Sequence, residues 1–82
     1  MQPTTGIVTL DLHGCNTYQA KIAIDAALRR AKGAYRLRLI HGFHGGTALR
    51  DMIRREYAHR SGILRVELGL NDGETDLVLR EW

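Results

Sequence analysis

The chain of 82 residues, 44% hydrophobic and 26% charged, has the size and composition of one small folded domain. No apolar run is long enough for a membrane span or a signal peptide, and the single cysteine, Cys15, excludes an internal disulfide and fits a reducing cytoplasm. The formal net charge of +3 is uneven, because residues 1–40 hold six basic residues against two acidic ones, whereas residues 41–82 hold six against seven. We expect residues 1–6 to form a flexible leader and residues 7–82 a single domain.

The first half of the chain predicts a strand, a helix and a second strand. Apolar residues alternate over Ile7–Leu12 and again over Arg36–Ile40, which is the pattern of strands with one buried face. Between them, Asn16 and Gln19 have the spacing of a capping box, and apolar residues then recur at helical spacing. Gly33 fits the residue that ends this helix.

The second half of the chain predicts one more helix and two more strands. Thr47 is the expected cap of the helix, and Ser61-Gly62 is the expected end. The apolar stripe of this helix consists of Leu49, Met52, Ile53 and Tyr57. Ile63–Leu70 alternates as a strand, Asn71-Asp72-Gly73 is a turn signal, and Leu77–Leu79 is a last short strand. The order of elements is therefore βαβαββ.

Two His-Gly pairs end the first two predicted strands, within Leu10–Gly14 and Leu39–Gly42. Strand–helix–strand units make right-handed crossovers between parallel strands, so both strand-to-helix turns are expected at the same edge of the sheet. Ligands of open α/β sheets bind just beyond the carboxyl ends of the strands. This placement makes the two pairs the candidate functional site.

Asp11 and His13 are the first candidates for chemistry, because residues two apart on a strand point to the same face. A carboxylate beside an imidazole holds its tautomer and raises its basicity, so that His13 can act as a general base or acid, with His41 arriving beside the pair. The alternative stays open that Asp11 bonds backbone groups at the helix start while His13 merely packs.

The glycine-rich segment from His41 to Gly46 precedes the second helix, where backbone N–H groups and the positive helix end suit a phosphate. The residues interpreted as phosphate- or nucleic-acid-binding are Gly42, Phe43, His44, Gly45, Gly46, Thr47, Arg50 and Arg54. Phe43 would stack on a base. Structural alternatives stay open: a tight turn for the glycines, core packing for Phe43, and outer-face ion pairs for the arginines.

Five basic residues and no acidic one lie between Arg29 and Arg38. Such a patch attracts phosphates, but cations also stabilise the carboxyl end of a helix, and we favour this second interpretation for the run.

A metal site is the other chemistry that the sequence raises. Asp11, His13, Cys15, His41 and His44 fall near one predicted edge, but their spacings match no standard zinc pattern. We therefore expect no required cofactor, while a loosely held divalent cation on the Asp11 side stays open.

Together these motifs resemble the Smr (small MutS-related) domain family over nearly the whole chain. The resemblance rests on Leu10–Gly14 before the first helix, on His41-Gly42 followed by Gly46 and Leu49-Arg50, and on Gly73-x-Thr75 before the last strand. It implies a two-layer α/β sandwich with a mixed four-stranded sheet and two helices, similar to the C-terminal domain of bacterial translation initiation factor three. It also implies nucleic-acid binding, because members bind nucleic acid and several are endonucleases on DNA or RNA, some of them at stalled, collided ribosomes.

The second motif departs from the family's usual pattern. His44 stands where a glycine is usual, and one residue is added before Leu49-Arg50. Because this changes the loop that would hold the phosphate, both cleavage and binding without cleavage stay open.

Three functions are therefore considered. In the first, an endonuclease, Asp11 orients His13 as general base or acid and His41 shares the proton transfer, while the glycine loop and Arg50 hold the scissile phosphate. The second is a non-catalytic module that binds nucleic acid or the ribosome. The third is a protein-interaction domain whose edge strand near Leu77 pairs with a partner. We expect a monomeric, cytoplasmic protein without a membrane partner.

Overall fold

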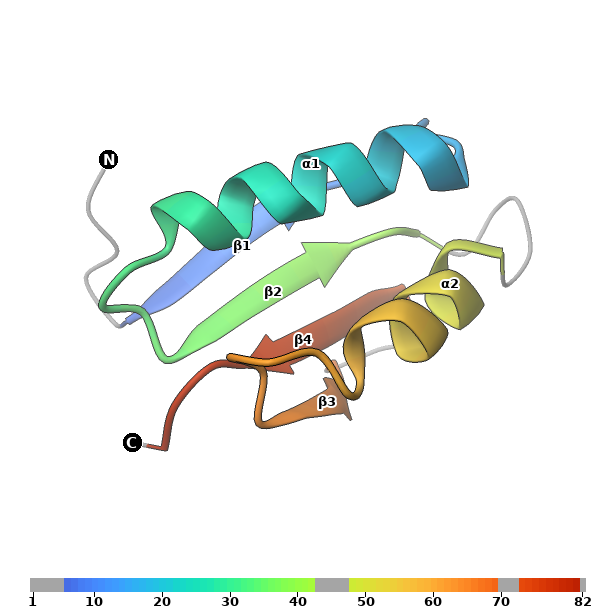
Figure 1. Ribbon diagram of the computed structural model, residues 1–82. Coiled ribbons are helices and arrows are strands. Elements are labelled where there is room, and N and C mark those ends of the chain that lie inside the picture. Colours follow the sequence, from blue (N-terminus) through green and yellow to red (C-terminus); the bar gives the residue numbers. More distant parts are fainter. Residues whose placement is uncertain (1–5, 43–47, 70–72, 82) are drawn as a thin grey trace.

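The structure of the protein, a computed structural model, describes residues 6–42, 48–69 and 73–81. Within these residues the elements are β1 (Ile7–Asp11), α1 (Thr17–Arg30), β2 (Arg36–Ile40), α2 (Ala48–Tyr57), β3 (Arg65–Leu68) and β4 (Glu74–Val78). They follow the predicted βαβαββ order (Figure 1). No helix among these residues is long and apolar enough to cross a membrane.

The strands form one mixed four-stranded sheet in the order β1-β2-β4-β3. β1 and β2 pair in parallel, whereas β4 pairs antiparallel with both β2 and β3. Figure 1 shows α1 and α2 on the same face of the sheet, and we call the opposite face the open face. The fold is the two-layer α/β sandwich that the family resemblance implies.

The core lies between the helices and the sheet face that they cover. Leu37 and Leu39 of β2 and Leu77 of β4 are fully buried there. Ile24 of α1 and Ile53 of α2 belong to the same cluster and are also fully buried. Burial of each such side chain contributes about 1.5–3 kcal/mol, so this cluster fixes how the helices lie on the sheet.

A polar clamp of Asp25, Tyr57 and Arg60 joins α1 to the end of α2. The hydroxyl of Tyr57 donates to Oδ1 of Asp25 at 2.7 Å, and Nη1 of Arg60 donates to the same oxygen at 2.7 Å. Burial opposes ionisation of Asp25, but the hydrogen bonds from Tyr57 and Arg60, with the positive charges of Arg60 and Lys21, hold its pKa below the ordinary value of 3.8. Burial and the hydrogen bond to Asp25 raise the pKa of Tyr57.

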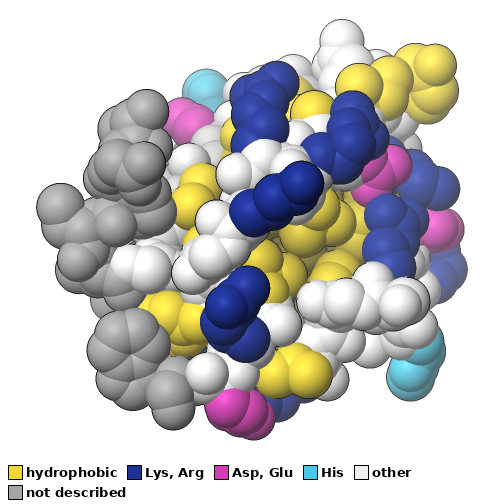
Figure 2. Space-filling model, turned by 60° about the vertical axis from the view of Figure 1, so that its left-hand side comes forward, with side chains coloured by type: hydrophobic (Ala, Val, Ile, Leu, Met, Phe, Trp, Pro, Cys, Tyr) yellow, Lys and Arg dark blue, Asp and Glu magenta, His cyan; other side chains and the backbone are white. Residues whose placement is uncertain are grey.

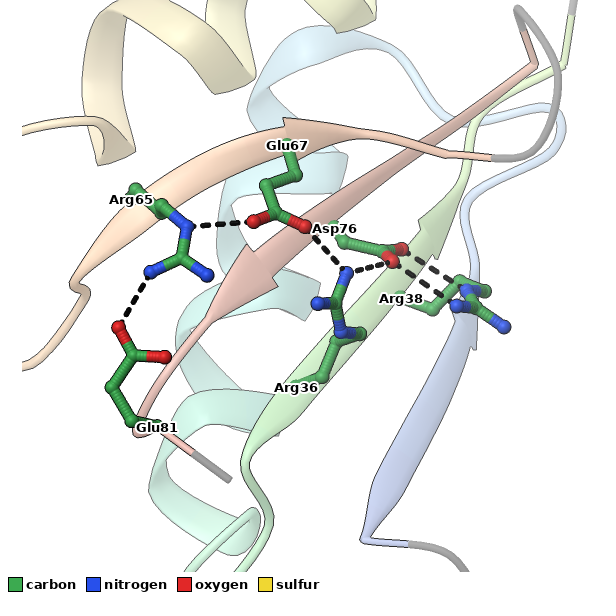
Figure 3. Close-up of polar contacts among 6 residues, drawn as sticks. All are labelled: Arg36, Arg38, Arg65, Glu67, Asp76 and Glu81. Atoms are coloured by element: carbon green, nitrogen blue, oxygen red, sulfur yellow. Dashed lines mark hydrogen bonds and ion pairs between the residues drawn. The ribbon is translucent and has the colours of Figure 1, made fainter.

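The open face is organised by an ion-pair network around Asp76 of β4, which is only 1% exposed (Figure 3). Its carboxylate accepts from Nη1 of Arg36 at 2.7 Å and from Nε and Nη2 of Arg38 at 3.1 Å each. Glu67 pairs with Arg36 at 2.9 Å. Hydrogen bonds to Asp76 raise the pKa of both arginines. Two of the five basic residues between Arg29 and Arg38, Arg36 and Arg38, are therefore paired with Asp76 of the neighbouring strand β4. The local sequence does not predict this pairing.

The capping box predicted for the first helix is confirmed. Oδ1 of Asn16 accepts from the Gln19 N–H at 2.7 Å, and Oε1 of Gln19 accepts from the Asn16 N–H at 3.0 Å. Ala31 is the C-cap of α1, so Gly33, with φ of +89°, lies in the turn just beyond the position predicted for it. The second helix ends at Tyr57, ahead of the predicted Ser61-Gly62.

The two last strands differ more from the prediction. β3 is shorter than the expected Ile63–Leu70, and β4 begins at Glu74 rather than at Leu77. The sequence does not reveal the start of β4 because its residues are polar. Asp76 bonds to Arg36 of β2, and Thr75 bonds to His41, which directly follows β2. Leu77 consequently lies in an internal strand, so the predicted edge-strand contact near Leu77 is wrong; the edges are β1 and β3.

Candidate nucleic-acid site at the carboxyl ends of β1 and β2

The parallel register brings the two His-Gly turns to the same edge of the sheet. Asp11, the last residue of β1, is paired with Ile40, the last residue of β2. The Leu12 N–H continues the pairing by donating to the Ile40 carbonyl at 2.7 Å. Figure 1 shows α1 and α2 both beginning at this end of the molecule. We call this end, with Asp11–Gly14 and His41-Gly42, the histidine edge.

The first turn is built by the backbone of Leu12 to Cys15. The Cys15 N–H donates to the Leu12 carbonyl at 3.0 Å, and Gly14 adopts a φ of +85°, which favours glycine. Oδ1 of Asp11 accepts from the backbone N–H of His13 at 2.8 Å. The carboxylate therefore fixes the turn through the backbone, which is the alternative left open for Asp11. The His13 side chain is exposed, and its ring has no hydrogen bond to any described residue.

The second turn holds its histidine very differently. His41 is only 6% exposed, and its Nε2 lies 2.9 Å from the hydroxyl of Thr75, which is fully buried. Its Nδ1 lies 3.2 Å from the Gly42 carbonyl. Because a carbonyl oxygen can only accept, Nδ1 donates in this contact, and in the tautomer with its proton on Nδ1 the Nε2 atom accepts from the Thr75 hydroxyl. Both ring nitrogens are thus engaged inside the protein.

Gly73, which directly precedes β4, holds the second turn in place. Its carbonyl accepts from the N–H groups of both His41 and Gly42, at 2.9 and 3.0 Å. Gly42 has a φ of +80°, which a residue with a side chain rarely adopts. The roles of Gly73 and Thr75 as supports for His41 were missed by sequence reasoning, although Gly73-x-Thr75 was among the residues that carried the family resemblance.

Asp11 and His41 lie on opposite faces of the sheet at this edge. Asp11 is in register with Ile40 on the open face, where Arg36 and Arg38 lie. His41 follows Ile40 by one residue and therefore lies on the helix-covered face, where it meets Thr75. No hydrogen bond between described residues joins the rings of His13 and His41.

Of the predicted phosphate-binding residues, Phe43, His44, Gly45, Gly46 and Thr47 lie outside the described residues. Arg50 lies in the first turn of α2 with a side chain 32% exposed. Its buried Nε makes no hydrogen bond to a described residue, and the nearest carboxylate, that of Asp51, is 3.7 Å away. Arg54 follows one turn later and is exposed.

A family model for the Smr domain matches residues 10–75, which is most of the chain. The chain belongs to the Smr domain family. Among solved structures, the Smr domain of Thermus thermophilus MutS2 has a similar fold, with 31% sequence identity, a TM-score of 0.78, and coverage of 90% of this chain and 99% of that one. The comparison with curated proteins gives no match.

The structure of this Smr domain also shows whether its described side chains could hold a metal ion. Within residues 6–42, 48–69 and 73–81, no three His, Cys, Asp or Glu side chains gather closely enough to hold a metal ion. Cys15 is half-buried beside the core cluster, as a small apolar residue would be. The described part of the site therefore consists of one exposed imidazole, one internally bonded imidazole, two glycine turns, and Arg50 and Arg54 of α2.

Proposed function

We propose that this Smr domain binds nucleic acid at the histidine edge and cleaves a phosphodiester bond there, with His13 as the general acid or base. The observation that supports the proposal most directly is that the imidazole of His13, which is exposed and bonds to no described residue, lies at the edge where the amino ends of both helices also lie. Helix amino ends attract phosphates, and an imidazole titrates near neutral pH.

The remaining site residues take supporting roles in this proposal. Asp11 sets the position of His13 by holding its backbone N–H. His41 is a positioning residue, because both of its ring nitrogens are engaged by Thr75 and Gly42. Arg50 supplies positive charge in the first turn of α2, where a phosphate oxygen would accept from its guanidinium.

With RNA the chemistry can be written without a metal ion. His13 takes the proton of the 2′-hydroxyl as its oxygen attacks phosphorus, and the bond from phosphorus to the 5′-oxygen breaks. The products are a 2′,3′-cyclic phosphate and a 5′-hydroxyl, whose oxygen takes its proton from water. DNA lacks this hydroxyl and would need a water nucleophile, for which a loosely bound divalent cation remains part of the proposal.

A second candidate function is binding without cleavage, to RNA or to a ribosomal surface. It is favoured by one observation: the Asp11 carboxylate bonds to backbone and the His41 ring to Thr75, so the described contacts contain no carboxylate–imidazole pair. If the domain binds without cleaving, its affinity for nucleic acid depends more on Arg50 and Arg54 than on His13.

Cleavage assays on single-stranded RNA and supercoiled DNA, each with and without a chelator, test the two candidates. Loss of a general acid or base lowers the rate by about 100-fold to 10,000-fold, so His13→Ala should lose cleavage on that scale. His59→Ala is the matched control, because His59 is also an exposed histidine but lies beyond the far end of α2.

Full cleavage by His13→Ala would exclude the assigned role. Binding by the wild-type domain with no cleavage of either substrate would establish the second candidate. Loss of cleavage in chelator alone would show that the divalent cation is required.

A further inference from the structure

A hollow lies between β1 and the carboxyl end of α1, away from the His-Gly turns of the histidine edge. It has a volume of about 510 Å³, within the usual range of ligand sites. Val8 and Leu10 of β1 and Ala27 of α1 provide apolar lining, while Arg30 and Lys32 lie at its margin. We call this hollow, defined by these five residues, the β1 groove.

The charge of the β1 groove is positive and uncompensated. Arg30 and Lys32 are exposed, and neither forms an ion pair with a described acidic residue; the same holds for their neighbour Arg29. No acidic side chain of a described residue lines the groove. Figure 2 brings forward the end of the molecule where α1 ends and β1 begins, and shows Lys and Arg side chains around apolar ones.

The fold therefore separates the basic run from Arg29 to Arg38 into two parts. Arg36 and Arg38 are bound by Asp76 on the open face and stabilise the sheet. Arg29, Arg30 and Lys32 remain without acidic partners among the described residues. Stabilisation of the helix end accounts for their charge, but it does not account for an apolar hollow beside them.

Apolar lining with cations at the margin suits a strand of nucleic acid better than an isolated anion. Bases and riboses have apolar surfaces that can lie on Val8, Leu10 and Ala27, while phosphates meet the two cations. The outer side of β1 adds backbone donors and acceptors, because β1 pairs only with β2 among the described strands.

The groove is also within reach of the histidine edge. β1 leads from one to the other, and the three residue steps from Val8 to Asp11 span about 10 Å at the rise of an extended strand. A single strand several nucleotides long can cover both places.

We propose that the β1 groove is a second contact for nucleic acid, which binds the part of a single strand that extends beyond the histidine edge. The proposal rests on the proposed function. It adds that affinity depends on strand length, because only strands long enough to reach Arg30 and Lys32 gain from them.

The test measures binding of a single-stranded dodecanucleotide and of a dinucleotide, in RNA and DNA, over a range of salt concentrations. For the dodecanucleotide, Arg30→Gln/Lys32→Gln should lower affinity about tenfold at low salt and reduce the salt slope by about 1.4, or 0.7 for each lost phosphate contact. Dinucleotide affinity should not change. In the NMR spectrum, the amide signals of Val8 and Leu10 should shift with the dodecanucleotide in the wild-type domain only.

The matched control is Arg55→Gln/Arg65→Gln, which removes the same charge from α2 and from β3 at the opposite edge of the sheet. Equal losses in both double variants would overturn the groove assignment, since net charge alone would then explain the result. An acidic peptide that displaces the dodecanucleotide at equal concentration would also overturn it. If the wild-type domain binds neither probe, the proposed function itself fails.

Discussion

The buried contact between Thr75 and His41 can be tested by replacing Thr75 with valine, which keeps the shape of the side chain and removes only the hydroxyl. The hydroxyl lies 2.9 Å from Nε2 of His41, Thr75 is fully buried, and His41 is 6% exposed. Water therefore has little access to the nitrogen that loses its partner. A buried polar atom left without a hydrogen bond costs about 1–3 kcal/mol, and we expect about 2 kcal/mol here.

This loss corresponds to about a 30-fold fall in the folding equilibrium constant and to a fall in Tm of about 8–16 °C for a domain of this size. Urea unfolding followed by circular dichroism measures it. Thr75→Ser keeps the hydroxyl and loses a methyl group, so about 1 kcal/mol is expected. Thr9→Val, at an exposed position of β1, should change stability by less than about 0.5 kcal/mol. A Thr75→Val domain as stable as the wild type, or one more stable than Thr75→Ser, would refute the assigned contact.

Two further predictions concern the hairpin and the helix clamp. Gly69→Ala should lower the free energy of unfolding by about 1–3 kcal/mol, because a Cβ at this position would overlap the Cβ of Glu74; urea unfolding measures this, and an unchanged midpoint would contradict it. In the folded domain the pKa of Asp25 lies below its ordinary value of 3.8. Its ionised carboxylate therefore contributes fully to the free energy of unfolding above pH 3.8, and this contribution is lost as the pH falls through the lower pKa of the folded state. Asp25→Asn should therefore be less stable than the wild type at pH 7, and the difference should shrink in acid; a difference that stays constant with pH would contradict this.

Local signals in the sequence were sufficient for most of the fold. The capping box at Asn16 and Gln19 and the alternation in β1 and β2 depend on neighbouring residues, and the structure confirms each of them. The order of elements and the parallel pairing follow from the handedness of the crossovers. The family resemblance added the mixed sheet and the two-layer arrangement.

The start of β4 could not be predicted in the same way. The predicted last strand began at Leu77 and left out Thr75 and Asp76, because strands that face a core are expected to be apolar. Each of these two residues bonds to a polar partner more than thirty residues away, His41 for one and the Arg36–Arg38 pair for the other. Pairing of this kind is a property of the assembled sheet, and no window of the sequence contains both members.

The same limit explains why two His-Gly pairs that look equivalent in the sequence differ in the structure. β1 ends at Asp11, so His13 lies two residues beyond its strand, whereas β2 ends at Ile40 and His41 lies one residue beyond. Alternation along a strand then places His41 on the helix-covered face, against Thr75, while His13 lies in an exposed turn. A difference of one residue thus separates an exposed ring from a buried one. Chemistry at this edge should accordingly depend on His13, whereas substitutions of His41 should act first on the stability of the turn that leads into the glycine-rich segment.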